Sequence, residues 1–494
     1  MSFSREKAPV LYAAPEPIQP SPQRSRLTII GFLSLALILT SLTLISGISW
    51  QPQTRKSSFF YNVTKIQGIC TDEAHSPVSH AGHIGLEGDT TDSPKRSFFW
   101  YFEAENDPET APVILTIGGG PGTSAMMNAL WGQSPCLSTE NGLIFNPHRW
   151  TERHNLIALD HPIGAGWSYG STVNNSRSAA EDVYDFLQKF FVLFPRLAGN
   201  KIVVSGGSYG GVYVPNIATV IHEQNIALAT TPSRSHNNVH INLDALILSN
   251  PATNPMSHWT WLLHYRCVEH KLYNSTDCTR LYAKLPSCQE SLDMAFTVPT
   301  RENRVAALEL CSQLNMGDMH GVNTEDIRET CIDPESPEGC HPEFSWVKKI
   351  FDHPLMREIL GLSMSDLNFT SLNMEVNAEF GAEGDLARPH HLLYPPLISA
   401  GILLHYVGAQ DANCAWPGVL SFLNLLNTPF QSDFLAAPDI PWPTKDVATV
   451  RTAGNCAGSM AYILVEAAGH FTVKDQPALA KTIVEHWVAN EPFF

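Results

Sequence analysis

The sequence has little charge, and its charge is mostly negative. Only 16% of its 494 residues are charged, and 31 basic residues against 48 acidic ones give a net charge of −17. Because an acidic surface repels polyanions, we expect no nucleic-acid partner. The hydrophobic residues make up 44% of the chain, which is enough for a large core in a globular protein.

The cysteines lack the closely spaced Cys-x-x-Cys pairs of a zinc site. Six of the ten cysteines fall between residues 267 and 340. Crowded cysteines without metal-ligand spacing favour disulfide bonds and an oxidising compartment. We therefore expect disulfides, whose pairing the sequence leaves open, and neither a metal site nor another cofactor.

One long run without charge lies near the N-terminus. It extends for 22 residues from Leu27 to Ile48 and begins just after Arg24 and Arg26. This length crosses a bilayer as a helix, whereas a cleaved signal normally has a shorter apolar run. We expect an N-terminal tail (1–26), a single transmembrane signal anchor (27–49) and a lumenal or extracellular domain. The alternative is a secreted or vacuolar protein whose signal is cleaved.

Four Asn-x-Ser/Thr triplets also favour the secretory pathway. Such triplets are acceptors of N-linked glycans when they lie on the surface of a lumenal domain, although they also occur by chance. The predicted glycosylation sites are Asn62, Asn174, Asn274 and Asn368.

Short β-branched or apolar runs alternate with amphipathic stretches along most of the chain. This alternation predicts the α/β class, with a mostly parallel sheet. The predicted strands are Ser97 to Phe102, Val113 to Ile117, Leu156 to Leu159, Ile202 to Ser205, Leu243 to Leu248, Ile402 to Val407 and Tyr462 to Val465, and the predicted helices include 179–194 and 212–227.

The strand pattern also divides the chain into segments. Residues 50–90 are polar and are predicted to form a stem and entry loops. Residues 251–396 lose the strand pattern and carry most of the cysteines, which predicts an inserted cap between two parts of the core, 91–250 and 397–494.

The segment from Lys201 to Pro215, KIVVSGGSYGGVYVP, contains a Gly-x-Ser-x-Gly pattern. It indicates a buried strand, a sharp turn at Ser208 and the start of a helix. A serine on such a turn is exposed above the sheet edge, and the helix N-terminus offers N–H groups to a developing oxyanion. Ser208 is therefore a candidate nucleophile. A glycine-rich loop without a catalytic role is the alternative.

Two later strands end in residues that would activate this serine. Asp411 follows the predicted strand 402–407, and His470 follows the predicted strand 462–465. A serine nucleophile needs a base, and the base needs an acid that fixes its tautomer. The order Ser208, Asp411, His470 is that of α/β-hydrolases.

The tract from Gly118 to Gly122, directly after a predicted strand, lacks the Lys-Ser/Thr of a phosphate-binding loop. Glycine lets the main chain approach a reacting carbonyl closely. We therefore expect the N–H groups of Gly120 and Tyr209 to form an oxyanion hole. A purely structural turn is the alternative.

Together these segments resemble the serine carboxypeptidase family. The resemblance covers residues 60–494 and implies an α/β-hydrolase fold with a disulfide-rich cap and a catalytic triad of Ser208, Asp411 and His470. It is carried by five blocks in the family's order: Gly119-Gly-Pro-Gly122, Asp160-His-Pro-Ile-Gly-Ala-Gly-Trp-Ser-Tyr169, Gly206-Gly-Ser-Tyr-Gly210, Gly408-Ala-Gln-Asp-Ala-Asn-Cys-Ala-Trp416 and Gly469-His470 with Asp475-Gln-Pro477.

The resemblance also implies a substrate site, and there the sequence departs from the family pattern. The predicted substrate-binding residues are Gly118, Gly119, Gly207 and Cys414, although Cys414 has the alternative of a packing or disulfide role. Members that release C-terminal residues hold the free carboxylate with one asparagine and two glutamates, and alignment of the blocks places Gly118, Gly132 and Gly207 at those positions. Without these side chains, a buried substrate carboxylate loses its hydrogen-bond partners.

The sequence thus predicts a serine hydrolase that works through an acyl-enzyme on Ser208 and acts on a peptide or a small acyl substrate. The first expectation is a serine-type carboxypeptidase. The alternative is an esterase or an acyltransferase on a small molecule, because plant relatives of the family transfer the acyl group to acceptors other than water. A non-catalytic binding protein is the third candidate, and retention of all three triad residues argues against it.

Overall fold

The computed structural model describes residues 59–230, 238–252, 254–331, 340–362, 366–400, 402–444 and 446–494. The tail and the transmembrane segment predicted from the sequence lie outside these residues. Among the helices that the structure does describe, none combines the length and the apolar character needed to cross a bilayer.

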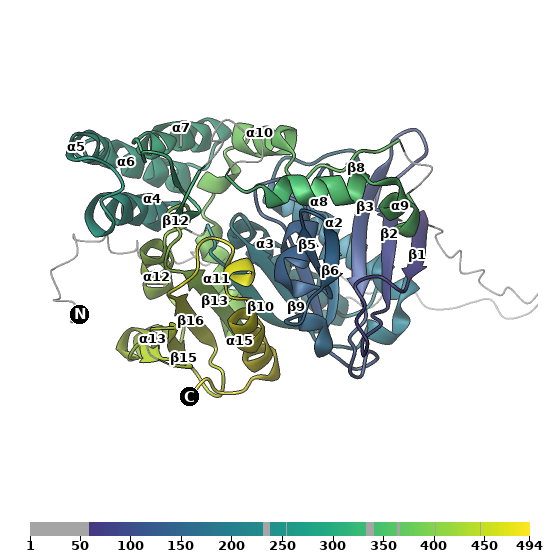
Figure 1. Cartoon of the computed structure of the whole chain (residues 1–494). Coiled ribbons are helices and arrows are strands. Elements are labelled where there is room, and N and C mark those ends of the chain that lie inside the picture. The colour runs from purple at the N-terminus through teal and green to yellow at the C-terminus, as the bar shows by residue number, and fades with distance from the viewer. Residues whose placement is uncertain are drawn as a thin grey trace, which may run out of the picture. The chain divides into compact units, whose positions relative to one another are not determined.

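A twisted sheet of twelve strands forms the centre of the molecule (Figure 1). Its order is β1-β2-β3-β7-β4-β9-β10-β13-β16-β15-β14, with β8 beside β3. The strands are β1 (Tyr61–Ile66), β2 (Ser79–Gly85), β3 (Lys95–Phe102), β4 (Val113–Ile117), β7 (Asn155–Leu159), β8 (Tyr169–Gly170), β9 (Ile202–Gly207), β10 (Leu243–Ser249), β13 (Ile402–Gly408), β14 (Ile440–Pro441), β15 (Ala448–Ala453) and β16 (Met460–Val465).

The six strands from β7 to β16 in this order pair in parallel, and the strands on either side pair antiparallel. Parallel strands are covered by helices on both faces, which explains their continuous apolar runs. Because their carboxyl ends lie at one edge, the loops that follow β4, β9, β10, β13 and β16 meet there. This edge carries the candidate site.

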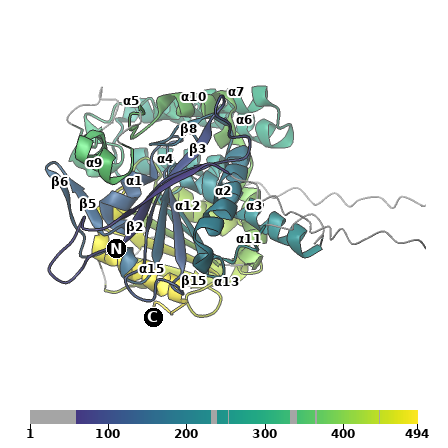
Figure 2. The ribbon, with the colours of Figure 1, turned by 90° about the vertical axis from the view of Figure 1, so that its right-hand side faces the viewer.

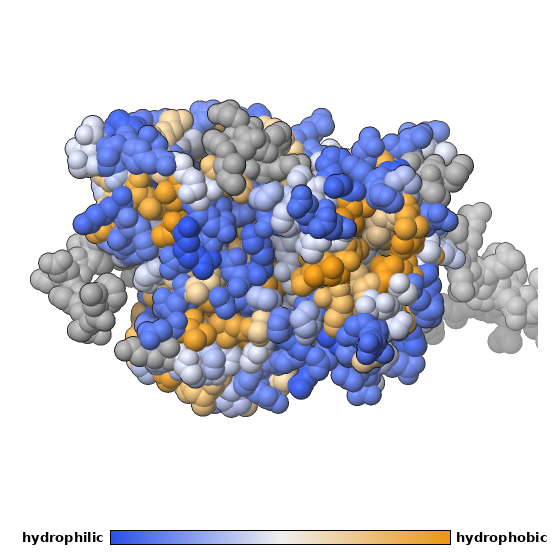
Figure 3. Space-filling model, viewed as in Figure 1, coloured by the Kyte–Doolittle hydropathy of each residue, from blue (hydrophilic) through white to orange (hydrophobic). Residues whose placement is uncertain are grey.

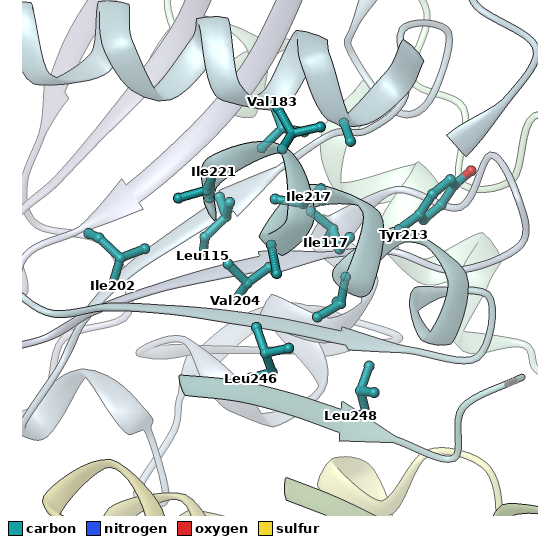
Figure 4. Close-up of a cluster of buried hydrophobic side chains, with 14 of the residues drawn as sticks. Leu115, Ile117, Val183, Ile202, Val204, Tyr213, Ile217, Ile221, Leu246 and Leu248 are labelled. Atoms are coloured by element: carbon teal, nitrogen blue, oxygen red, sulfur yellow. The ribbon is translucent and has the colours of Figure 1, made fainter. Parts of the chain in front are cut away.

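Successive residues of the central strands point to opposite helical layers. Leu115, Val204 and Leu246 pack in one core with α2 (Ser176–Leu193) and α3 (Gly210–Thr230), as Figure 4 shows. Ile114, Val203 and Ile247 pack in a second core with α15 (Pro477–Ala489). This alternation fixes the register of the strands, because a slip by one residue would exchange the two faces.

The other helices of the core parts are short. They are α1 (Ala125–Asn128), α12 (Trp416–Leu425), α13 (Gln431–Ala436) and α14 (Thr472–Asp475), and α1 continues into the π-helical turn η1 (Ala129–Gln133). A separate hairpin of β5 (Cys136–Thr139) and β6 (Gly142–Phe145) follows η1. In Figure 2, the long strands and the helices on their two faces are seen from the side of β1 and β2.

Residues 251–396 form a helical region along one side of the sheet (Figure 1). Its elements are α4 (Pro255–His264), η5 (Tyr265–Glu269), α5 (Ser275–Tyr282), α6 (Leu285–Thr297), α7 (Arg301–Ser312), α8 (Glu343–Asp352), α9 (Pro354–Ile359), α10 (Met374–Ala382), α11 (Tyr394–Ala400, which ends beyond the region) and a small hairpin of β11 (Val322–Asn323) and β12 (Asp326–Thr330). Three disulfides staple it, Cys267–Cys278, Cys288–Cys311 and Cys331–Cys340. A fourth joins Cys70 to Cys136.

The structure corrects the sequence prediction for residues 50–90. This segment was predicted as a stem with entry loops, but β1 and β2 lie within it and form one end of the sheet. The strand β1 is partly exposed and polar, so it lacks the apolar run that marks the central strands.

The face shown in Figure 3 is mostly hydrophilic, with an apolar patch over the β5–β6 hairpin and the neighbouring helices α8 and α9. Ile144 of β6 and Leu355 of α9 are exposed by 51% and 58%. Leu143, Ile350 and Met356 line a shallow hollow between them.

Candidate active site

Ser208 lies on the turn between β9 and α3. Its backbone has a φ of 56°, in the left-handed region that residues with a Cβ rarely adopt. The turn is held on both sides, because the Ser208 N–H donates to Ser249 O at 3.1 Å and the Ser208 carbonyl accepts the N–H groups of Gly211 and Ala252. A strained residue that is fixed in this way is typical of a nucleophile elbow.

The glycine-rich loop after β4 packs against this turn. A Cβ on Gly119 would lie 2.8 Å from the Ser208 Cβ and 3.1 Å from the Tyr209 nitrogen, so only glycine allows the approach. The N–H groups of Gly120 and Tyr209, predicted to form an oxyanion hole, have no hydrogen-bond acceptor within the described part of the chain. Gly120 and Ser208 line the same cavity.

Asp411 and His470 meet at the same edge of the sheet. The loop after β13 carries Asp411, the loop after β16 carries His470, and their Oδ2 and Nδ1 atoms lie 2.6 Å apart. Asp411 is fully buried, and His470 is 4% exposed. A carboxylate that accepts the Nδ1 proton leaves Nε2 as the basic nitrogen of the imidazole.

A third residue at this edge, Asn250, completes the network around Asp411. It follows β10 directly, and its Nδ2 donates to Asp411 Oδ2 at 2.8 Å. Its Oδ1 accepts hydrogen bonds from Gly408 N and from the Thr472 hydroxyl. The backbone N–H groups of residues 413 and 414 donate to Asp411 Oδ1. Four donors, with His470 Nδ1 as the fourth, therefore fix the orientation of the Asp411 carboxylate.

The hairpin of the cap contributes Glu325 to the site. The Glu325 carbonyl accepts the His470 N–H at 2.7 Å, and the Glu325 carboxylate lies 2.7 Å from His341 Nε2. Burial raises the pKa of Glu325, but its contact with His341 and the charge of His470 lower that pKa below its usual range overall. A negative charge is thus kept beside the imidazole.

The two carboxylates change the basicity of His470. Burial lowers the pKa of the imidazole, whereas the charge and hydrogen bond of Asp411 and the charge of Glu325 raise it, to about 9 overall. The pair therefore stabilises the imidazolium that forms when a serine hydroxyl gives up its proton.

Ser208 and His470 open into one cavity of about 430 Å³. Its apolar wall includes Met127, Phe344 and Phe471. Its polar wall is rich in amides, contributed by Asn128, Gln133, Asn323, Asn377 and Asn413. Within the described part of the chain, Glu325 is the one carboxylate in the lining, and no lysine or arginine lines it.

Comparison with known proteins assigns the chain to a family. The model of the serine carboxypeptidase family matches residues 72–490. This chain belongs to the serine carboxypeptidase family. By family and homology it is a serine-type carboxypeptidase, a hydrolase with the α/β-hydrolase fold.

Individual relatives agree with this assignment to the serine carboxypeptidases. Carboxypeptidase Y homolog A of Leptosphaeria maculans is 28% identical over 414 residues, which cover 82% of this chain and 72% of the relative. The protein of the same name from Ajellomyces capsulatus is 29% identical over 415 residues, with the same coverage. The structure of Kex1(Δ)p, a prohormone-processing carboxypeptidase from Saccharomyces cerevisiae, superposes with a TM-score of 0.71 at 23% identity, over 86% of this chain and 94% of that chain.

The predicted substrate-binding residues of this serine carboxypeptidase lie in different places. Gly119 and Gly207 line the cavity, whereas Gly118 is not among the described lining residues, and a Cβ on Gly118 would lie 1.9 Å from Thr123 O. Cys414 is a free, buried thiol. Its Sγ lies within 4.8 Å of a carboxylate oxygen of Asp411 and of a ring nitrogen of His470. Burial, with the charges of Asp411 and Glu325, raises the pKa of the Cys414 thiol well above its usual value, so it is protonated.

The four predicted glycosylation sites, Asn62, Asn174, Asn274 and Asn368, are all exposed on the surface. The Asn274 side chain also caps α5, because its Oδ1 accepts the Asp277 N–H. Exposure meets the first requirement for attachment of a glycan. Glycosylation itself stays a prediction.

Several residues of the site were not predicted from the sequence. Asn250 carried a usable signal, because it follows an apolar strand as Asp411 and His470 do. Glu325 comes from the cap hairpin and Gln133 from an irregular helix, where no periodic pattern points toward the catalytic edge.

Proposed function

We propose that Ser208 is the nucleophile of this serine carboxypeptidase, with His470 as its general base and Asp411 as the acid that orients it. His470 Nε2 takes the proton of the Ser208 hydroxyl as Oγ bonds to the substrate carbonyl carbon. The N–H groups of Gly120 and Tyr209 stabilise the oxyanion. His470 then gives its proton to the leaving amine, and water releases the acyl group by the reverse steps.

The observation that carries this proposal is the buried Asp411–His470 bond beside a cavity that Ser208 also lines. Three separate strands bring these side chains to one edge of the sheet. A structural role alone would not require a serine with a φ of 56°, an ion pair and a cavity at the same place.

A second candidate activity is ester hydrolysis or acyl transfer to a small molecule. It is favoured by Gly118, Gly132 and Gly207, which occupy the positions where the family holds a substrate carboxylate. A Cβ on Gly118 would lie 1.9 Å from Thr123 O, and one on Gly132 would lie 2.7 Å from Val473 O. Neither position accepts a side chain without movement of the backbone. Gly207 has more room, since its Cβ would lie 3.3 Å from Ser249 O.

The nucleophile is tested by labelling with a fluorophosphonate probe. We expect the wild type to be labelled stoichiometrically, and Ser208→Ala to lose both labelling and turnover while its folding changes by less than about 1 kcal/mol. Ser421→Ala, a buried serine on α12, is the matched control and should label normally. Labelling of Ser208→Ala at the wild-type rate would contradict the assignment, and an unlabelled wild type would favour a binding protein.

The substrate class is tested with matched free-acid and C-terminally amidated peptides and a simple ester across pH 4 to 9. Without the family's carboxylate-binding side chains, amidation should change kcat/KM by less than about tenfold, or roughly 1.4 kcal/mol. A preference of a hundredfold or more for the free acid would mean that other residues bind the carboxylate. In that case the ester and acyl-transfer activities lose their support.

A further inference from the structure

Gln133 is a buried amide in the catalytic cavity, and the described residues give its side chain no hydrogen-bond partner. Its side chain is 3% exposed and lines the cavity with Ser208 and His470. Gln133 Oε1 is buried and receives no hydrogen bond from the described residues. Because buried polar atoms are almost always hydrogen-bonded, an orphaned amide beside a nucleophile indicates a position that a ligand completes.

The backbone around Gln133 is fixed before any ligand binds. The buried Asn146 donates through Nδ2 to the carbonyls of Gly132 and Ser134, one on each side of Gln133, at 2.9 and 2.8 Å. Gly132 packs so closely on Val473 that a Cβ there would lie 2.7 Å from the Val473 carbonyl oxygen. The Gln133 side chain is therefore presented to the cavity by a rigid turn.

A second amide, one turn earlier on the same helical segment, is oriented in a similar way. Asn128 lines the cavity and donates through Nδ2 to Ile117 O at 2.9 Å. One of its two amide N–H groups is thereby engaged, which fixes the orientation of the amide. Asn128 and Gln133 thus offer hydrogen-bonding atoms without charge on one wall of the site.

The described lining offers no uncommitted cation to an anionic group. No lysine or arginine of the described residues lines the cavity, and the His470 imidazole there already interacts with the carboxylates of Asp411 and Glu325. A primary amide both donates and accepts, and another amide is its complement, because two such groups pair through two hydrogen bonds. A carboxylate, which only accepts, would leave Gln133 Oε1 without a donor.

We propose that Gln133 is a specificity-determining residue that binds an uncharged carboxamide of the substrate, with Asn128 beside it. The inference rests on the acyl-enzyme reaction of Ser208 proposed above. It goes beyond that reaction by naming the group recognised and the residue that recognises it.

The test compares Gln133→Met and Gln133→Glu with the wild type on three substrates. They are a peptide with a C-terminal carboxamide, its free acid, and a short p-nitrophenyl ester that has no amide. Gln133→Met keeps the length of the side chain but cannot hydrogen-bond, so kcat/KM for the carboxamide should fall about tenfold while the ester changes less than about twofold. Gln431→Met, on α13 and away from the cavity, is the control.

Gln133→Glu adds a second readout because its carboxyl titrates. Below about pH 5 a protonated glutamate donates to a carboxylate, so this variant should prefer the free acid at acidic pH and lose the preference as pH rises. The proposal would be overturned if the ratios of kcat/KM among the three substrates were unchanged in both variants. It would also be overturned if Gln133→Met lowered kcat/KM equally for all three substrates.

Fluorophosphonate labelling separates this inference from the reaction on which it rests. Gln133→Met should label at the wild-type rate, since the probe needs only the triad and the oxyanion hole. If the wild type is not labelled, the proposed acyl-enzyme reaction is contradicted, and so is the proposed role of Gln133, which depends on it. If labelling is normal but the substrate ratios do not move, only the role of Gln133 is wrong.

Discussion

His470 is placed between two carboxylates of different origin. Asp411 belongs to the α/β core and bonds the imidazole directly, whereas Glu325 belongs to the cap and bonds the His470 backbone through its carbonyl. Both charges favour the imidazolium. Since His470 must be neutral to accept the serine proton, these carboxylates should move the active pH range upward from that of an ordinary histidine.

The first prediction concerns Glu325→Gln. With an ordinary imidazole, acylation would rise through about pH 6 to 7, but the raised pKa of His470 should shift the rise of kcat/KM to higher pH in the wild type. Removal of the Glu325 charge should lower the apparent pKa of that rise. A pH profile on a simple ester measures it, with Glu329→Gln on the same hairpin as control. A profile of Glu325→Gln that coincides with the wild type would show that Glu325 does not tune His470.

The sequence alone was sufficient to predict those site residues that come directly after a strand. Ser208, Asp411 and His470 each come after an apolar run, and parallel pairing brings the ends of those runs together. Glu325 and Gln133 reach the same cavity from segments without regular periodicity. The placement of Glu325 depends on how the cap folds back, and that of Gln133 depends on an irregular helical turn of the core, so neither leaves a local signal in the sequence.

The cap does more than cover the sheet, because its backbone is bonded to both loops of the candidate triad. The Ala412 N–H donates to Thr324 O, and the His470 N–H donates to Glu325 O. From η5, the Arg266 guanidinium donates twice to Ala412 O, at 2.9 and 2.6 Å. The cap thus helps to set the position of Asp411 and His470.

The second prediction concerns Arg266→Met. Arg266 is 3% exposed, and methionine keeps much of its apolar stem while losing both hydrogen bonds to Ala412. We expect fluorophosphonate labelling to slow by about tenfold or more, and the free energy of unfolding to fall by about 1–3 kcal/mol. Denaturant unfolding and labelling rates measure the two effects. Arg280→Met, on α5 of the same cap, is the control. It should leave the labelling rate unchanged and should change the free energy of unfolding by no more than about 0.5 kcal/mol. An unaltered labelling rate would show that Arg266 does not position the Asp411 loop.

The central strands were predicted well because they are buried on both faces. Each predicted run from 97–102 to 462–465 overlaps a strand of the sheet, and the predicted helices 179–194 and 212–227 overlap α2 and α3. The antiparallel strands β1, β2 and β15 were missed. They mix exposed or small polar residues with apolar ones, so their periodicity is weak. Disulfide pairing was likewise out of reach, because it depends on distances between helices.

Two features of the described domain are typical of proteins of the secretory pathway. Four disulfides are present, and four Asn-x-Ser/Thr sites are exposed. Disulfides persist in oxidising compartments, where glycans are also added. These features concern the described domain, whereas the run from Leu27 to Ile48 lies outside it.

We propose that the full chain is anchored by the run from Leu27 to Ile48, with the hydrolase domain in the lumen or outside the cell. Its 22 uncharged residues are long enough for one crossing, and the glycan acceptors all lie after it. Full-length protein should therefore stay with membranes after an alkaline carbonate wash and shrink on deglycosylation. Replacement of all four acceptor asparagines by glutamine should abolish the shrinkage but not the membrane retention, because the two properties depend on different segments. A mature chain that starts near residue 50 and occurs only in the soluble fraction would identify the run as a cleaved signal instead.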